Sequence, residues 1–357
     1  MMTRRFSYLF LMLLIGAALS AQSHPVLKLF KANNPNIQYF GRIDFSNPLK
    51  PRFWSPGVYI RIKFNGPACD LIVNDEMGGD NHNYVEIAID DEPQVRIKLT
   101  SKVNVVKAAR GLSDAEHILT ICKDTESGIG YLELTGIKCV ALLPPPPKPK
   151  RKIEYIGDSI TTGSGIDIAE TPCDAGKWYD QHNAYMSYGA LTSRALNAQW
   201  QLTAVAGIGL THSCCKMDMV MPDVVDKTFL RDNKITWDFK RYQPDVVTIC
   251  LGQNDGIVDS SLFCGAYVKF IGDVRKHYPQ ADIICLTSPM ANDKLSAVLK
   301  RYLSGITANL NDAGVKKVYK YYFSKRYFHG CGTHPDMEEQ AQIAEELTAY
   351  IKQVEGW

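Results

Sequence analysis

The chain has little excess of charge of either sign. Its 357 residues contain 40 Lys and Arg against 38 Asp and Glu, a formal net charge of +2, and no long charged run lies outside the segment near residue 150. Nucleic-acid-binding proteins carry clustered basic charge, so we expect no nucleic-acid partner.

No internal repeat period is evident. The 45% hydrophobic and 22% charged content is that of a globular protein, and the length favours two domains.

Long hydrophobic runs are also missing after the first 21 residues. Arg4 and Arg5 precede an apolar stretch, residues 6–19, which is too short to cross a bilayer comfortably. Small residues follow at Ser20 and Ala21. A charged start, an apolar middle and a small-residue cleavage site are typical of a secretory signal peptide, here residues 1–21. We expect export to a periplasm or out of the cell, with no membrane insertion after cleavage.

The ten cysteines include no Cys-x-x-Cys pair with matching histidines, so a metal site is not expected. Export permits disulfides. Cys250 and Cys285 lie inside apolar runs, where a reduced cysteine is a common core residue. The candidates for bridges lie in more irregular sequence, and their pairing is left open: Cys173, Cys214, Cys215, Cys264 and Cys331.

A proline-rich segment, residues 144–152 (PPPPKPKRK), divides the chain into two parts. Successive prolines favour an extended, stiff conformation, so this segment is interpreted as a linker. Before it, residues 24–143 contain short runs in which apolar and polar residues often alternate. This pattern predicts an antiparallel β-sandwich. The expected strands are 58–64, 70–73, 84–89, 95–99, 117–122 and 131–134.

After the linker, residues 153–357 alternate apolar strand-like runs with longer helical patterns, which predicts a parallel sheet covered on both faces. The expected strands are 153–156, 202–206, 245–251, 282–287 and 315–321, and the expected helices are 185–197, 262–277, 294–311 and 336–354. Ligands of such sheets bind outside the carboxyl ends of the strands. Three polar or glycine-bearing segments follow expected strands and should meet at this edge: residues 157–159, 206–207 and 252–254.

Ser159, in residues 155–166 (YIGDSITTGSGI), is a candidate nucleophile. A serine hydroxyl needs a neighbouring base and donors for the developing oxyanion; a turn or helix cap is the alternative explanation. Gly207, in residues 205–209 (VAGIG), allows a backbone N–H to approach a substrate carbonyl, or serves only a tight turn.

Asn254 and His334 complete the candidate set. The Asn254 amide can donate to an oxyanion, although Asn and Asp also cap turns, the role expected for Asp255. His334, in residues 331–336 (CGTHPD), can take the serine proton, although a lone histidine is more often a surface or packing residue. Asp336 and Glu339 resemble a helix capping box.

The order and spacing of these four blocks resemble those of the SGNH, or GDSL-type, hydrolases over roughly residues 153–355. The resemblance implies a flavodoxin-like parallel sheet, with Ser159 as nucleophile and His334 as base. The oxyanion donors would be the N–H groups of Ser159 and Gly207 and the Asn254 amide. Gly207 is preferred to Gly209 by its distance from the strand.

The sequence departs from that family's pattern at Cys331, where the family usually has an Asp that orients the histidine. A thiol or half-cystine is a poor substitute for a carboxylate beside an imidazolium. Either a backbone carbonyl or a distant acid must therefore orient His334. We expect the carbonyl, and hence a Ser–His dyad.

Four motifs lie in the first part of the chain: residues 39–42 (YFGR), 53–57 (FWSPG), 64–66 (FNG) and 125–128 (TESG). They resemble the jelly-roll module of carbohydrate esterase family 2. The resemblance implies an esterase that removes acetyl groups from plant polysaccharides such as xylan and glucomannan. Some members use a Ser–His dyad, in agreement with Cys331.

Sugar rings stack on aromatic faces, so Trp178, Tyr179 and Trp237 are candidate substrate-binding residues, with simple packing as the alternative. The chemistry requires no metal or organic cofactor, and no glycine-rich phosphate loop is present. Two other functions stay open: an SGNH esterase acting on peptidoglycan or small acyl esters, and a non-catalytic glycan-binding protein. The sequence does not indicate an oligomeric state.

Overall fold

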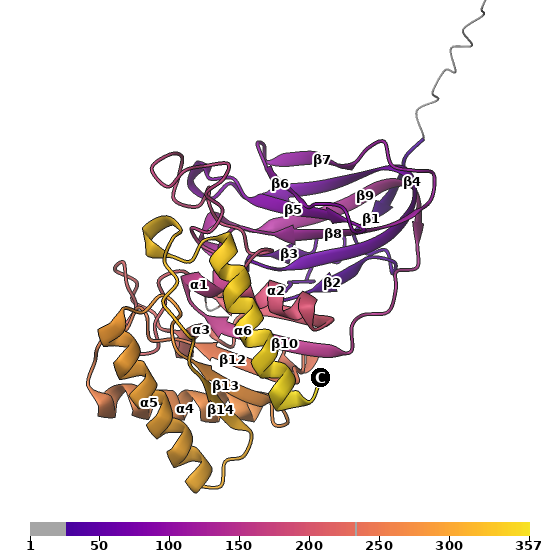
Figure 1. The fold of residues 1–357 in the computed structure, drawn as a ribbon. Helices are drawn as coiled ribbons and strands as arrows, with labels where there is room; N and C mark the ends of the chain where they lie inside the picture. Colours follow the sequence, from indigo (N-terminus) through magenta and orange to yellow (C-terminus); the bar gives the residue numbers. More distant parts are fainter. Residues whose placement is uncertain (1–25, 233) are drawn as a thin grey trace, which may run out of the picture.

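A computed structural model describes residues 26–232 and 234–357 of the chain (Figure 1). The expected signal peptide lies outside the described residues. The chain forms an all-β module followed by an α/β module, and Figure 1 shows the two packed together with the purple sandwich above the sheet that contains β10. Both expected fold classes are confirmed.

The first module is a nine-stranded antiparallel arrangement in the order β1-β9-β4-β8-β5-β6, with β2 and β7 paired to β4 and β3 paired to β9. Its elements are β1 Lys28–Lys31, β2 Gln38–Phe40, β3 Arg52–Phe53, β4 Tyr59–Asp75, η1 Gly78–Asp80, β5 Tyr84–Ile89, β6 Val95–Lys98, β7 Val103–Ala109, β8 Glu116–Lys123, η2 Ser127–Ile129 and β9 Leu132–Leu143.

One expectation about this module is wrong. The sequence predicts two strands at 58–64 and 70–73, whereas the structure has the single 17-residue strand β4. The intervening residues shift the register against β9 between Asn65 and Cys69 instead of ending the strand. Gly66 lies there with φ +100°, a conformation that L side chains rarely adopt, which explains why a turn-like signal occurs inside a strand.

The second module contains a five-stranded parallel sheet in the order β11-β10-β12-β13-β14, the flavodoxin-like arrangement. Its strands are β10 Arg151–Gly157, β11 Ala198–Ala204, β12 Val246–Cys250, β13 Asp282–Leu286 and β14 Val318–Tyr321. Its helices are α1 Ser159–Thr162, α2 Tyr188–Ala195, α3 Met221–Val224, η3 Phe239–Arg241, α4 Ser260–His277, α5 Asp293–Asp312, η4 Cys331–Thr333 and α6 Met337–Glu355.

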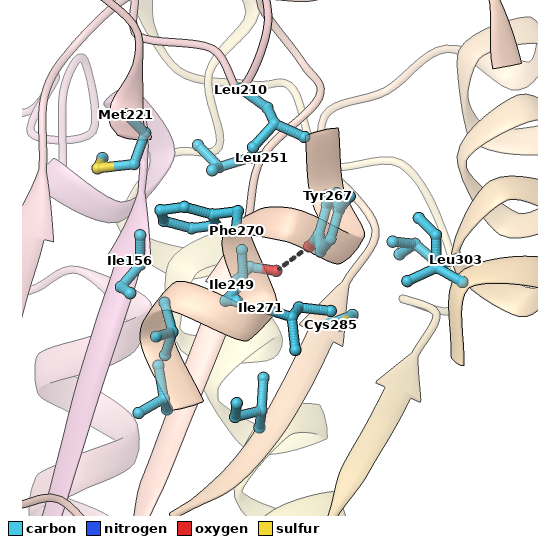
Figure 2. Close-up of a cluster of buried hydrophobic side chains, with 14 of the residues drawn as sticks. Ile156, Leu210, Met221, Ile249, Leu251, Tyr267, Phe270, Ile271, Cys285 and Leu303 are labelled. Atoms are coloured by element: carbon cyan, nitrogen blue, oxygen red, sulfur yellow. Dashed lines mark hydrogen bonds between the residues drawn. The ribbon is translucent and has the colours of Figure 1, made fainter. Parts of the chain in front are cut away.

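Each face of this sheet is buried under a separate group of helices. Alternate side chains of one strand point to opposite faces, so neighbouring residues belong to different cores. Ile156 belongs to the core beneath α4 and α5, whereas Tyr155 belongs to the core shared with α2 and α6. Figure 2 shows part of the first core, with Phe270 and Ile271 near Ile249 and the Tyr267 hydroxyl donating to the Ile249 carbonyl oxygen at 3.1 Å. Burial on both faces explains the nearly continuous apolar strands.

The helices form where apolar residues recur with helical spacing. In α5 the buried residues include Leu295, Leu299, Leu303, Ile306 and Leu310, three or four positions apart, so one face meets the sheet. The predicted capping box is confirmed at the start of α6, where Asp336 and Glu339 satisfy each other's backbone N–H groups.

The proline-rich segment between β9 and β10 lies against both modules and does not hold them apart. Gln38 Nε2 donates to the carbonyl oxygen of Pro146 at 2.9 Å, and Lys148 Nζ donates to that of Tyr39 at 2.8 Å. On the other side, Gln199 Nε2 of β11 donates to the carbonyl oxygen of Pro149 at 2.6 Å. Contacts with both modules restrict the movement of one against the other.

A buried arginine also joins the modules. Arg42 Nη2 lies 3.0 Å from Glu154 Oε1 on β10, and both side chains are 0% exposed. Arg42 Nη1 donates to the carbonyl oxygens of Val225 and Lys227, each at 2.6 Å. Because an uncompensated buried charge costs several kcal/mol, this pair favours one relative arrangement of the two modules.

Aromatic packing reinforces this contact. Tyr59 of β4 stacks on Trp200 of β11 with 3.7 Å between ring centroids, and Trp200 Nε1 donates to the Gly57 carbonyl oxygen at 2.9 Å. The interface is therefore part of the apolar core beneath α2 and α6. Within the described residues, none of the helices has the length and apolar character needed to cross a membrane.

Candidate active site

Ser159 lies immediately beyond the carboxyl end of β10. Asp158 caps the short helix α1, accepting the N–H of Ile160 at 3.0 Å, and Ser159 is the first helical residue. A Cβ on Gly157 would lie 2.1 Å from Thr161 Oγ1, so only glycine allows this close turn. The N–H of a first helical residue has no acceptor within its helix, and Ser159 N–H is therefore available to a ligand.

His334 is hydrogen-bonded to Ser159. Its Nε2 lies 2.7 Å from Ser159 Oγ, and its Nδ1 lies 2.8 Å from the carbonyl oxygen of Cys331. A carbonyl only accepts, so Nδ1 carries the proton and Nε2 is free to accept from the serine hydroxyl. The group that orients the ring is thus a backbone carbonyl, the alternative that the sequence favours over a distant acid.

The turn that carries this carbonyl is held by a disulfide and by backbone hydrogen bonds. Cys331 is bonded to Cys173, 158 residues earlier in the sequence. Its N–H donates to the Gly165 carbonyl oxygen at 2.8 Å, and the Gly330 N–H donates to the His334 carbonyl oxygen at 2.7 Å. These contacts fix the position of the carbonyl on which His334 depends.

The structure distinguishes the two glycines that follow β11. The Gly209 N–H is occupied, because it donates to Ser213 Oγ at 3.0 Å, and a Cβ there would lie 1.8 Å from the His212 carbonyl oxygen. Gly207 has φ +87° and lines the cavity beside Ser159. In the described ranges the Gly207 N–H has no protein acceptor. Gly207, not Gly209, therefore offers a free donor.

Asn254 also lines the cavity, although its amide is already engaged. Nδ2 donates to the Ile208 carbonyl oxygen at 2.9 Å and to Asp158 Oδ2 at 3.3 Å. The second contact is long and therefore the weaker one. Asp255 has the structural role expected of it: its carboxylate accepts the N–H groups of Leu210 and Thr211 and holds the loop after Gly207.

One cavity of about 900 Å³ is lined by Ser159, Gly207, Asn254 and His334. Trp178, whose exposed fraction is 59%, lines it too. The structure does not bring the other two aromatic candidates there. Tyr179 is 1% exposed and packs in a small core of its own. Trp237 is 3% exposed and lines a different hollow, with the Arg42 guanidinium 5.3 Å from its ring centroid. Both are packing residues, the alternative that the sequence left open.

Burial sets the protonation of the site. It lowers the pKa of His334 below the ordinary value, with the Cys331 carbonyl acting in the opposite direction. It also raises the pKa of Asp158 to about 7. His182 lines the cavity next to Trp178, and burial lowers its pKa well below the ordinary value. Both histidines are therefore neutral near pH 7, which is the form in which His334 can accept a proton.

The cysteine expectations are mostly confirmed. Cys173–Cys331 and Cys214–Cys215 are the disulfides of the described residues, while Cys250 and Cys285 are free and buried. Cys264 is the error, because it is free. It lies within α4, in the helix predicted over residues 262–277, and is partly buried against the apolar core.

Several cavity-lining residues had no role assigned from the sequence, among them His182, Arg231 and Met217. Nothing in their local sequence marks them, because each comes from irregular sequence between the regular elements. The adjacent pair Cys214–Cys215 could have been recognised as a feature of the site, since it follows Gly207 by only seven residues.

One group of side chains has atoms close enough to hold a metal ion. In the part of the chain that the structure describes, ligand atoms of His329, Asp336 and Glu339 lie within 4.8 Å of one another. The capping box and the pair between His329 Nδ1 and Glu339 Oε1, 2.7 Å apart, account for this cluster without an ion. It does not line the cavity of Ser159.

Both modules match known families. Residues 39–147 match the family described as "Carbohydrate esterase 2 N-terminal", and residues 155–320 match the "GDSL-like Lipase/Acylhydrolase family". The chain is 31% identical over 340 residues to an "Acetylxylan esterase / glucomannan deacetylase" of Cellvibrio japonicus, covering 91% of each protein. It is 33% identical over 335 residues to "Cellulase/esterase CelE" of Acetivibrio thermocellus, covering 91% of this chain but 40% of that protein.

The solved structures that resemble this chain include family two carbohydrate esterases. A family two carbohydrate esterase from Clostridium thermocellum, in complex with cellohexaose, is 32% identical, with a TM-score of 0.82 over 90% of this chain and 99% of that chain. A family two carbohydrate esterase from Cellvibrio japonicus is 28% identical, with a TM-score of 0.84 over 94% of this chain and 99% of that chain.

The protonation of His334 can be tested directly. Because burial lowers its pKa, the ring should titrate with a midpoint below 6.5, the ordinary value, and be neutral at pH 7. NMR of ring-labelled histidine across pH 4.5–8 measures this midpoint, and the signal missing from a His334→Gln sample identifies the residue. A midpoint at or above 6.5 contradicts the prediction.

Proposed function

Because this chain belongs to carbohydrate esterase family 2, we propose that it removes O-acetyl groups from plant polysaccharides, xylan and glucomannan, through an acetyl-enzyme formed on Ser159. The observation that carries this mechanism is the 2.7 Å contact between Ser159 Oγ and His334 Nε2, in a cavity that also contains free N–H donors. The names of the relatives from Cellvibrio japonicus support the choice of substrates.

In the first step, Ser159 Oγ attacks the acetyl carbonyl carbon while His334 Nε2 accepts the hydroxyl proton. The carbonyl oxygen becomes an oxyanion within reach of the N–H groups of Ser159 and Gly207. Asn254 is the third donor, and its amide gives up the 3.3 Å contact with Asp158 to reach the oxyanion. Donors arranged in advance are effective because they need little reorganisation as the charge develops.

The intermediate then collapses. His334 returns its proton to the sugar oxygen, the ester bond breaks, and the deacetylated sugar leaves with its hydroxyl restored. Water next attacks the acetyl group on Ser159 with His334 as base, and acetate is released as the serine recovers its proton. Throughout, the Cys331 carbonyl oxygen accepts a hydrogen bond from the Nδ1–H of His334 and stabilises the imidazolium by its dipole. A dipole stabilises this charge less than a carboxylate does.

Export is part of the proposal. The pattern of residues 1–21 supports it, and so does the presence of two disulfides at the candidate site, since disulfides persist in oxidising compartments. A polymeric substrate is also met outside the cytoplasm.

The function itself is tested by acetate release from acetylated xylan and acetylated glucomannan. We expect release by the wild-type protein and a loss of at least about 1000-fold in Ser159→Ala, because the nucleophile is missing. Equal release by the two proteins contradicts the role of Ser159. Hydrolysis of 4-nitrophenyl acetate without release from either polysaccharide favours an esterase for other acyl substrates, and binding of the polysaccharides without any hydrolysis favours a glycan-binding protein.

Asn254→Ala should lower turnover on the order of 100- to 1000-fold, the usual effect of losing one oxyanion donor. The KM should change little, because the interaction forms chiefly in the transition state. Steady-state kinetics with 4-nitrophenyl acetate measure both constants. Turnover close to that of the wild type would remove Asn254 from the mechanism.

Expression of the full-length chain in a bacterial host tests export. We expect a mature protein in the periplasm or medium that begins at residue 21 or 22, as read by N-terminal sequencing. A chain lacking residues 1–21 serves as the control and should stay in the cytoplasm. Retention of the complete N-terminus in a cytoplasmic protein contradicts the proposal.

A further inference from the structure

One wall of the cavity has no part in the acyl-transfer steps. It is formed by Arg231 and by the segment that contains Cys214, Cys215 and Met217, next to the turn of Ala206 and Gly207. Arg231 Nη2 lies 3.4 Å from the Ala206 carbonyl oxygen, and Cys214 N–H donates to the Gly207 carbonyl oxygen at 2.8 Å. We call this the Gly207 wall.

The β-sandwich holds Arg231 in place. Glu126 is 0% exposed and accepts from Arg231 Nε at 2.9 Å and from Arg231 Nη2 at 2.6 Å. Its other oxygen accepts the Gly128 N–H. A Cβ on Gly128 would lie 2.8 Å from Glu126 Oε2 and 3.2 Å from Arg231 Nε, so glycine leaves the room that the guanidinium occupies. Residues 125–128, one of the motifs of the first module, thus orient an arginine of the second.

The charges at this wall are balanced. Glu126 neutralises Arg231, and Lys216 and Asp218, which also line the cavity, carry opposite charges. Arg231 Nη1 has no protein acceptor in the described ranges, while Nε and Nη2 are occupied. The guanidinium therefore presents hydrogen-bond donors without a net positive field. This chemistry suits the hydroxyl, ring and acetyl oxygens of a neutral sugar better than an acidic ligand.

The remaining part of the Gly207 wall is formed by apolar, sulfur-containing side chains. Cys214 is bonded to its neighbour Cys215, and oxidation removes the thiol donors of both residues. The Cys214 sulfur packs on Gly207, where a Cβ would approach it to 2.8 Å, and the Met217 methyl group lies 3.6 Å from the same position. Soft, polarisable sulfur is a suitable partner for the C–H face of a pyranose ring.

We propose that Arg231, the Cys214–Cys215 disulfide and Met217 form a sugar-binding subsite, which takes a neutral sugar residue of the acetylated glycan beside the acetyl group. An apolar surface with a few well-placed donors is the usual composition of a small-ligand site. This inference rests on the proposed function, because it assigns the glycan part of the same substrate. Glu126 of the β-sandwich is then a positioning residue for substrate binding, because it holds Arg231 in place.

The test compares a glycan substrate with one that has no sugar. Arg231→Met alone would leave Glu126 buried and unpaired, which is costly, so the double variant Glu126→Gln/Arg231→Met removes both charges together. Cys214→Ser/Cys215→Ser removes the disulfide part of the sulfur surface independently. The matched control is Arg301→Met, an exposed arginine on α5 away from the cavity. Circular dichroism and thermal unfolding establish that each variant is folded.

Kinetics are measured with acetylated glucomannan oligosaccharides and with 4-nitrophenyl acetate. Loss of a hydrogen bond from a charged donor should raise the KM for the oligosaccharides about tenfold or more in the Arg231 variant. The ratio of kcat/KM for oligosaccharide to that for 4-nitrophenyl acetate should therefore fall at least about fivefold in both designed variants. It should stay constant in Arg301→Met.

The other outcomes overturn the inference in different ways. Equal losses of kcat on both substrates mean that the wall only positions Gly207 and binds no sugar. An unchanged ratio and unchanged KM mean that the glycan does not contact these residues. If the wild-type protein hydrolyses 4-nitrophenyl acetate but releases no acetate from any glycan, the proposed function fails first and the subsite fails with it.

Discussion

The contact between His334 Nδ1 and the Cys331 carbonyl oxygen, 2.8 Å long, is the interaction on which the site depends. It selects the tautomer in which Nε2 faces Ser159 and can accept a proton. A carbonyl on a mobile turn could not hold the ring in one orientation. The disulfide to Cys173 and the backbone bond to Gly165 hold this turn, so covalent and backbone constraints act where the wider SGNH family usually has a carboxylate.

The two modules act as one structure. The pair of Arg42 with Glu154 and the stack of Tyr59 on Trp200 join them through buried contacts. Glu126 extends this dependence to the cavity, because a carboxylate of the sandwich holds an arginine of the hydrolase part. The first module therefore contributes to the active-site cavity as well as to the stability of the chain.

The two disulfides of the described residues lie beside two different parts of the candidate active site. Cys173–Cys331 holds the histidine turn, and Cys214–Cys215 lies against Gly207, the proposed oxyanion donor. Neither disulfide belongs to the apolar cores, which contain the free cysteines Cys250 and Cys285. Oxidation thus stabilises the parts of the site that come from irregular loops, where regular hydrogen bonding is sparse.

The sequence by itself determined the two fold classes, the positions of the long helices, and the residues that meet at the edge of the parallel sheet. Local periodicity and the rule that strands end at one edge are enough for this. The continuity of β4, the burial of Tyr179 and Trp237, the free state of Cys264 and the placement of Arg231 beside Gly207 were decided only by the tertiary structure. Each depends on a partner distant in sequence, as Arg231 depends on Glu126, and no local pattern records which distant residue will be adjacent.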